Sequence, residues 1–135
     1  MAEFVNELAL LSGGPTQTGR TVKVNNCDKV ILSVVVSVTA ATLQATLALG
    51  GTSDPDRSID GTASLAVLTG SLASAVPASV TLPATGLLTF NNLGIGTQEV
   101  VVVYTSFPRF VRPVWTFTSG GGTVSVSAYI SAWAT

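Results

Sequence analysis

The most constraining feature of this chain is a strict alternation of apolar and small polar residues. It is clearest near the C-terminus, where one set of alternate positions holds Val124, Val126, Ala128, Ile130, Ala132 and Ala134. The intervening positions hold Thr123, Ser125, Ser127, Tyr129, Ser131 and Trp133. A period of two places successive side chains on opposite faces of a β-strand. Val and Thr, the two commonest residues, are β-branched and suit a pleated surface. The pattern therefore predicts a chain built from strands.

Clusters of Gly, Asn and Pro separate the alternating runs. Gly and Asn tolerate positive φ and Pro fixes its own φ, so such clusters indicate turns. They are Gly13-Gly14-Pro15, Asn25-Asn26, Gly50-Gly51, Asp54-Pro55, Asn91-Asn92 and residues 94–96. Strands are then expected near residues 20–24, 29–39, 42–50, 80–90, 97–105, 109–118 and 122–133. Short strands at this spacing predict an all-β fold, an antiparallel β-sandwich or jelly roll in a single domain.

The C-terminal third gives finer expectations. The run 110–117 is predicted to be the hairpin partner of the last strand, across Gly120-Gly121-Gly122. Within it, Trp115 is expected in the core, and Pro113 suggests a sheet edge or a bulge, because proline cannot donate to a ladder. The run 100–103 is apolar at every position, which is typical of a central strand covered on both faces.

Two segments allow more than one interpretation. Residues 1–18 are expected to form an extended N-terminal arm preceding a sandwich domain at 19–135. The spacing of Phe4, Leu8 and Leu11 also fits a helix face, and the alternation of Phe4, Asn6, Leu8 and Leu10 also fits a strand. Four apolar side chains of this arm, Phe4, Val5, Leu8 and Leu11, are candidate contacts with a neighbouring subunit. Residues 61–79 fit a short helix or a long ordered loop equally well.

Charge and residue usage exclude several functions. The chain has 135 residues, 6 Lys and Arg, 7 Asp and Glu, no His and a net charge of -1. A nucleic-acid-binding protein needs a basic surplus, so that class is not expected. The charge-free run 30–49 is long enough to span a membrane, but its period of two favours soluble strands. The N-terminus lacks the basic region of a secretory signal, so none is expected.

No catalytic or metal-binding constellation emerges from the sequence. Cys27 has no histidine to activate it, so it is interpreted as an unreactive thiol. Asp54, Asp56 and Asp60 lie in one stretch, but Pro55 and Arg57 interrupt the calcium-loop pattern and favour a solvated loop. The sequence therefore predicts a protein that is not an enzyme and needs no metal or cofactor.

Two aromatic residues of the last strand are the remaining binding candidates. Tyr129 and Trp133 share its serine-rich face. They suit either a platform for sugars or anchors in a protein interface, where Trp and Tyr are enriched. Only 10% of residues are charged and mean hydropathy is +0.56. A surface so poor in charge favours association with other protein, so the interface interpretation is preferred.

A resemblance supports the same direction. Residues 110–117 read Phe-Val-Arg-Pro-Val-Trp-Thr-Phe, followed by glycines and the alternating Val124-Ser125-Val126-Ser127-Ala128. This ending resembles that of small bacteriophage virion proteins, in which an aromatic-Val-Arg-x-x-Trp strand precedes a Gly/Ser turn and a serine-rich strand. The run 37–47, Ser-Val-Thr-Ala-Ala-Thr-Leu-Gln-Ala-Thr-Leu, resembles their Val-Thr-Ala…Thr-Leu strand pair. The uncharged stretch at 61–98 departs from the pattern.

The resemblance implies a capsid decoration, or cement, protein. Such a chain would be made in the cytoplasm of a host bacterium, bind the major capsid protein on the outside of the head, and self-associate as a homotrimer. The alternative is a receptor- or glycan-binding domain associated with a tail or fibre, which would place exposed aromatic residues over a groove.

Overall fold

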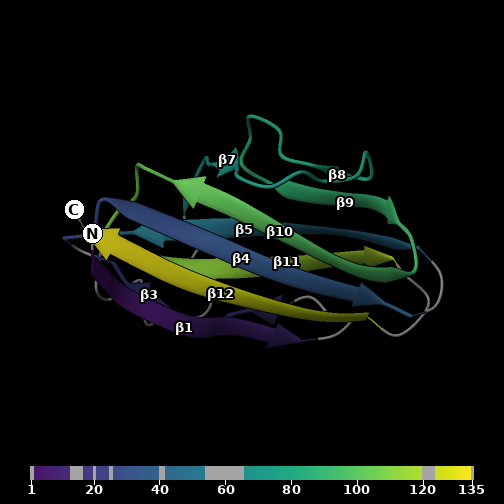
Figure 1. Ribbon diagram of the computed structural model, residues 1–135, viewed down its shortest axis with the longest axis horizontal. Coiled ribbons are helices and arrows are strands. Elements are labelled where there is room, and N and C mark those ends of the chain that lie inside the picture. Colours follow the sequence, from purple (N-terminus) through teal and green to yellow (C-terminus); the bar gives the residue numbers. More distant parts are fainter. Residues whose placement is uncertain are drawn as a thin grey trace.

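The computed structural model is an all-β sandwich of two antiparallel sheets (Figure 1). It describes residues 2–12, 17–19, 21–24, 26–39, 42–53, 66–119 and 124–134, and none of these residues is helical. The predicted all-β class and sandwich are confirmed. The part of the run 61–79 that is described, residues 66–79, contains two short strands in place of the helix that the spacing allowed.

The first sheet has five strands. In spatial order they are β1 (Ala2–Ser12), β12 (Val124–Ala134), β4 (Lys29–Val38), β10 (Gly96–Tyr104) and β7 (Ser71–Leu72). Every neighbouring pair is antiparallel. The residues expected as an N-terminal arm thus form β1 at one end of this sheet, while residues 13–16 of that segment lie outside the described part of the chain.

The second sheet lies against the first. Its main order is β2 (Gln17–Thr18), β11 (Phe110–Ser119), β5 (Leu43–Thr52), β9 (Leu88–Leu93) and β8 (Val80–Thr81). Two further short strands join it, β3 (Val22–Lys23) beside β11 and β6 (Ala66–Val67) beside β5. On one side, β11 pairs only with the short strands β2 and β3. Pro113 lies between the β11 residues that pair with these two strands, so it is close to a sheet edge, as expected.

Several strands that follow one another in the chain lie in opposite sheets. This is true of β4 and β5, of β9 and β10, and of β11 and β12. The predicted hairpin between 110–117 and the last strand is therefore wrong. β11 pairs with β5, and β12 lies between β1 and β4. A glycine-rich segment indicates only that the chain changes direction. It does not show whether the next strand pairs with the previous one in a hairpin or enters the other sheet.

The space between the sheets is filled by the apolar positions of the alternating strands. In β12, Val124, Val126, Ala128, Ile130 and Ala132 are buried, as predicted. Trp115 is 0% exposed and packs on Phe90, with ring centroids 5.9 Å apart. In β10 only alternate residues are buried, and Val101 and Val103 are half-buried. The expectation that both faces of 100–103 are covered is therefore wrong.

Two of the expected turns lie inside strands. Gly50-Gly51 belongs to β5. Position 51 requires glycine for packing, because a Cβ there would lie 2.5 Å from the Pro108 ring. Asn91-Asn92 belongs to β9, where a positive φ of 58° at Asn92 accompanies a register shift against β5. Conversely, the strand expected at 80–90 is divided by a turn in which Gly86 N–H donates to Pro83 O at 3.0 Å.

Candidate functional site

The outer face of the five-stranded sheet is the broadest continuous candidate surface. We call it the serine–valine face. It consists of the residues of β12, β4 and β10 that alternate with buried ones: Ser125, Ser127, Tyr129, Ser131, Trp133, Lys29, Ile31, Ser33, Val35, Ser37, Thr97, Glu99, Val101 and Val103. Only Lys29 and Glu99 among them carry charge. A surface this poor in charge has a low desolvation cost on contact with protein.

Strand register arranges the serine–valine face in rows. One central row joins Tyr129, Ser33 and Val101. The next row joins Ser131, Ile31 and Val103 in the same way. Each row combines a small hydroxyl side chain with apolar ones and contains no charge, so the middle of the face offers apolar area with a few hydrogen-bonding groups.

The two predicted aromatic contacts both lie on the serine–valine face. Tyr129 is 42% exposed, one of the most exposed large apolar side chains in the described structure. Trp133 is partly buried, and its indole N–H is buried without a hydrogen-bond partner. Four residues along a strand separate them by about 13 Å. They therefore cannot stack on one sugar ring together, but they can contact different parts of one protein surface.

The four apolar N-terminal candidates all lie in β1. Leu8 is in register with Tyr129 and Leu11 with Ser127, so these two positions border the serine–valine face. Val5 is in register with Ala132, and Phe4 falls at a register shift. Their side chains lie outside what the structure describes, so their contact with a partner stays a prediction.

The outer face of the second sheet is different in character. Thr116, Thr46, Thr89 and Thr81 form one row across β11, β5, β9 and β8. Cross-strand threonine pairs stabilise a sheet by a few tenths of a kcal/mol up to about 1 kcal/mol each. The row is polar and lacks aromatic anchors, which makes it a useful reference surface.

Arg112 on this second sheet was not singled out by the sequence. Its side chain is 5% exposed, the one charged side chain that the described residues bury. It stands opposite Gly50 of β5, where the missing side chain leaves room for the long arginine stem. The Gly-Gly pair in a strand facing an arginine was the available signal, but it was interpreted as a turn.

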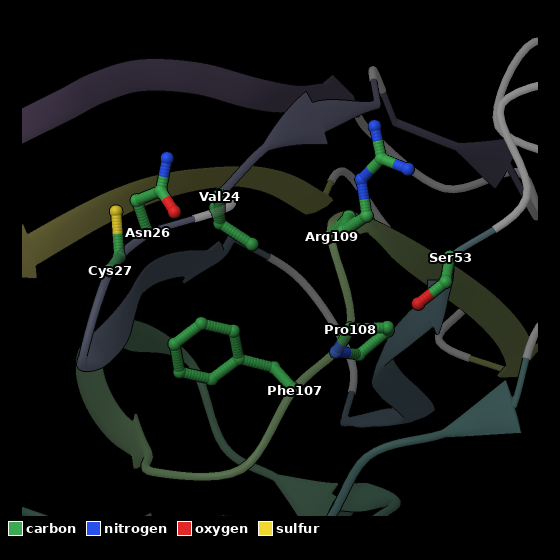
Figure 2. A pocket seen from close by; sticks show the side chains of 7 residues that line it. All are labelled: Val24, Asn26, Cys27, Ser53, Phe107, Pro108 and Arg109. Atoms are coloured by element: carbon green, nitrogen blue, oxygen red, sulfur yellow. The ribbon is translucent and has the colours of Figure 1, made fainter.

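A pocket of about 490 Å³ opens at one end of the sandwich. Its lining residues come from three places, namely the segment preceding β4, the end of β5, and the loop before β11: Val24, Asn26, Cys27, Ser53, Phe107, Pro108 and Arg109. Figure 2 shows the Phe107 ring on one side of the pocket, Asn26 and Cys27 on another, and the Arg109 side chain extending away from the ring. Asn26 has a positive φ of 66°, as expected for a turn there.

The pocket combines apolar and polar groups in a volume typical of ligand sites. Burial and the neighbouring Asp28 carboxylate raise the pKa of the Cys27 thiol, so it is protonated and uncharged at neutral pH. Among the described residues that line the pocket, Arg109 is thus the one that carries a charge. Its guanidinium lies 5.4 Å from the Phe110 ring centroid, within cation–π distance.

The predicted acidic loop, Asp54, Asp56 and Asp60, lies outside the described residues. In the part of the chain that is described, no three His, Cys, Asp or Glu side chains gather as metal ligands would. No helix there is long and apolar enough to cross a membrane.

Comparison with known proteins adds no assignment. No protein-family description, curated protein or solved structure matches the chain. Any function must therefore be argued from the surfaces just described.

Proposed function

We propose that this chain is a structural protein of a bacteriophage virion, a decoration protein that binds the outside of the head and bridges major capsid subunits. The observation that carries the proposal is the serine–valine face. Its central rows combine Tyr129, Ile31 and Val101 with serines and contain no charge. Such a face binds by apolar burial and shape, which suits a protein whose role is to hold others together.

The strand order supports the proposal. When β2 and β3 are taken as one position, the main strands run β1-β12-β4-β10 in one sheet and β2/β3-β11-β5-β9 in the other. Successive main strands change sheet except between β5 and β9, which pair with each other, and later strands return beside earlier ones, as in the Greek keys of a jelly roll. We infer that the sandwich is a jelly roll, a fold that viral capsid domains share with lectins.

The size of the face indicates that one sheet surface is not the whole contact. Three strands about 4.8 Å apart and nine residues about 3.4 Å apart cover a flat area of about 440 Å². A stable specific interface buries about 800 Å² on each partner. Bridging several capsid subunits therefore requires β1 to join the contact, and Leu8 and Leu11 border the face. Phe4 and Val5 stay candidate contacts from the sequence alone, since Val5 is in register with the buried Ala132 and Phe4 falls at a register shift. Self-association as a homotrimer would supply further area.

A matched pair of variants tests the proposal. Tyr129→Lys places a charge on the serine–valine face, and Thr116→Lys places one at an exposed position of the threonine row. Neither position is buried, so each change should alter the free energy of unfolding by about 0.5 kcal/mol or less. Tyr129→Lys should abolish binding to capsids of the encoding phage and Thr116→Lys should not, as measured by co-sedimentation. Equal binding of both variants would contradict the proposal.

A tail- or fibre-associated receptor domain is the second candidate. The pocket beside Phe107 and Arg109 is the observation that favours it, because lectins use concave sites with an apolar floor and a few polar groups. Binding of the chain to purified tails and not to heads would support this alternative over decoration.

A further inference from the structure

We propose that the pocket at the end of the sandwich binds a sugar ring bearing a carboxylate, as in a uronic or other acidic monosaccharide unit. This is independent of capsid binding, because none of the pocket residues belongs to the serine–valine face. The argument rests on the shape of the pocket, the chemistry of its lining and the rigidity of its walls.

The lining selects a ligand with both apolar and polar parts. Phe107, Pro108 and Val24 supply apolar surface against which the C–H face of a sugar ring can pack. The Asn26 carboxamide and the Ser53 hydroxyl donate and accept hydrogen bonds, as sugar hydroxyls require. The volume of about 490 Å³ lies within the roughly 300–1,000 Å³ of small-ligand sites, so a monosaccharide fits.

The charge at the mouth selects a carboxylate. Arg109 is exposed at the rim, and a guanidinium forms paired hydrogen bonds with a carboxylate. None of the seven lining residues is an acid. Two further cationic residues lie on elements next to the pocket: Lys23 is on β3 opposite Phe110, and Lys29 begins β4. The one acidic residue described there is Asp28. Among the described residues around the pocket, positive charge therefore exceeds negative charge, which favours an anionic ligand.

The walls are fixed before any ligand arrives. Val24 N–H donates to Arg109 O at 2.7 Å and joins the segment before β4 to the loop before β11. Pro108 of that loop sits against Gly51 of β5, where any side chain would collide with it. A pocket whose walls are tied in this way loses little conformational entropy on binding.

Nuclear magnetic resonance titration of the full chain tests the proposal, with glucuronic acid as the probe. Glucuronamide, its neutral amide, and acetate, a carboxylate without a ring, are the comparison ligands. We expect glucuronate to bind about tenfold more tightly than either and to shift the amide signals of Asn26 and Ser53. Weak binding, with a Kd of about 1 mM, is sufficient.

Two variants locate the interaction. Arg109→Gln, at an exposed position, should remove the preference for glucuronate over glucuronamide while leaving the fold intact. Phe107→Ala should weaken both ring ligands about equally. Thr116→Ala on the other sheet is the control and should change nothing. The proposal is overturned if no ligand shifts the signals at about 10 mM, if acetate binds as tightly as glucuronate, or if Arg109→Gln keeps the preference. Capsid co-sedimentation of Arg109→Gln separates this result from the proposed structural function, since it should be unchanged.

Discussion

Truncating Trp115 probes the packing on which the sandwich depends. The side chain is 0% exposed and lies against Phe90 between the two sheets. A buried tryptophan covers about 200 Å², which at about 25 cal/mol per Å² corresponds to about 5 kcal/mol of apolar burial. Its indole N–H is buried without a hydrogen-bond partner, which already costs about 1–3 kcal/mol. Trp115→Ala removes both contributions and leaves a cavity, so we expect a loss of about 3–4 kcal/mol in the free energy of unfolding.

Urea denaturation at one fixed protein concentration measures this loss, because self-association would otherwise change the midpoint. Trp133→Ala, on the partly exposed outer face, is the matched control and should cost under about 2 kcal/mol. Trp115→Phe retains a ring and removes the unpaired N–H, so it should cost less than half as much as Trp115→Ala. A loss below about 1 kcal/mol for Trp115→Ala would refute the placement of this ring in the core.

Three further predictions concern other parts of the molecule. Gly51→Val should lower stability by about 1–3 kcal/mol, since its Cβ would lie 2.5 Å from the Pro108 ring, whereas Gly94→Ala, with nothing within 4 Å, should be close to neutral in the same urea assay. The raised pKa of Cys27 predicts that iodoacetamide reacts more slowly with the folded chain than with the unfolded chain at pH 8, and an equal or faster rate would contradict it. Burial raises the pKa of Tyr104, so the unfolded state loses this proton first as pH rises. Stability should therefore fall above about pH 10. Phenolate absorbance from Tyr104 should appear only when the chain unfolds. Ionisation of Tyr104 at its ordinary pH in the folded chain would argue against its burial.

The sequence was sufficient for most of the long strands and for the buried face of the last one, although it did not predict the turn within 80–90 or the half-exposed face of 100–103. Alternation in 124–134 correctly separated the buried valines and alanines from Tyr129 and Trp133, because side-chain direction in a strand depends only on the period of two. The same local rule placed Trp115 in the core. These inferences succeed because each depends on the residues of one strand.

Pairing could not be inferred in the same way. Whether β11 turns back on β12 or crosses to the other sheet depends on which distant strands fit beside each, and here β5 and β4 occupy those places. Gly50-Gly51 was likewise interpreted as a turn, because the approach of Pro108 from a loop more than fifty residues later has no local signal.

The candidate sites show the same division. Tyr129 and Trp133 were found from their strand face. The pocket joins segments from before β4, after β5 and before β11, so no single stretch of sequence indicates it. Phe107 and Arg109 belong to it only because the Val24 N–H bond and the Gly51 contact bring their loop to that end of the sandwich.

Salt dependence distinguishes capsid attachment by apolar burial from attachment by charge pairs. Screening at about 1 M salt shortens the Debye length to about 3 Å, which weakens charge pairs and leaves apolar burial intact. The measurement is the fraction of the wild-type chain that co-sediments with the phage capsids proposed as its partner in about 0.15 M and about 1 M sodium chloride. If the uncharged central rows of the serine–valine face form the contact, this fraction will be unchanged at the higher concentration. Release of the chain from the capsids in high salt would contradict the account.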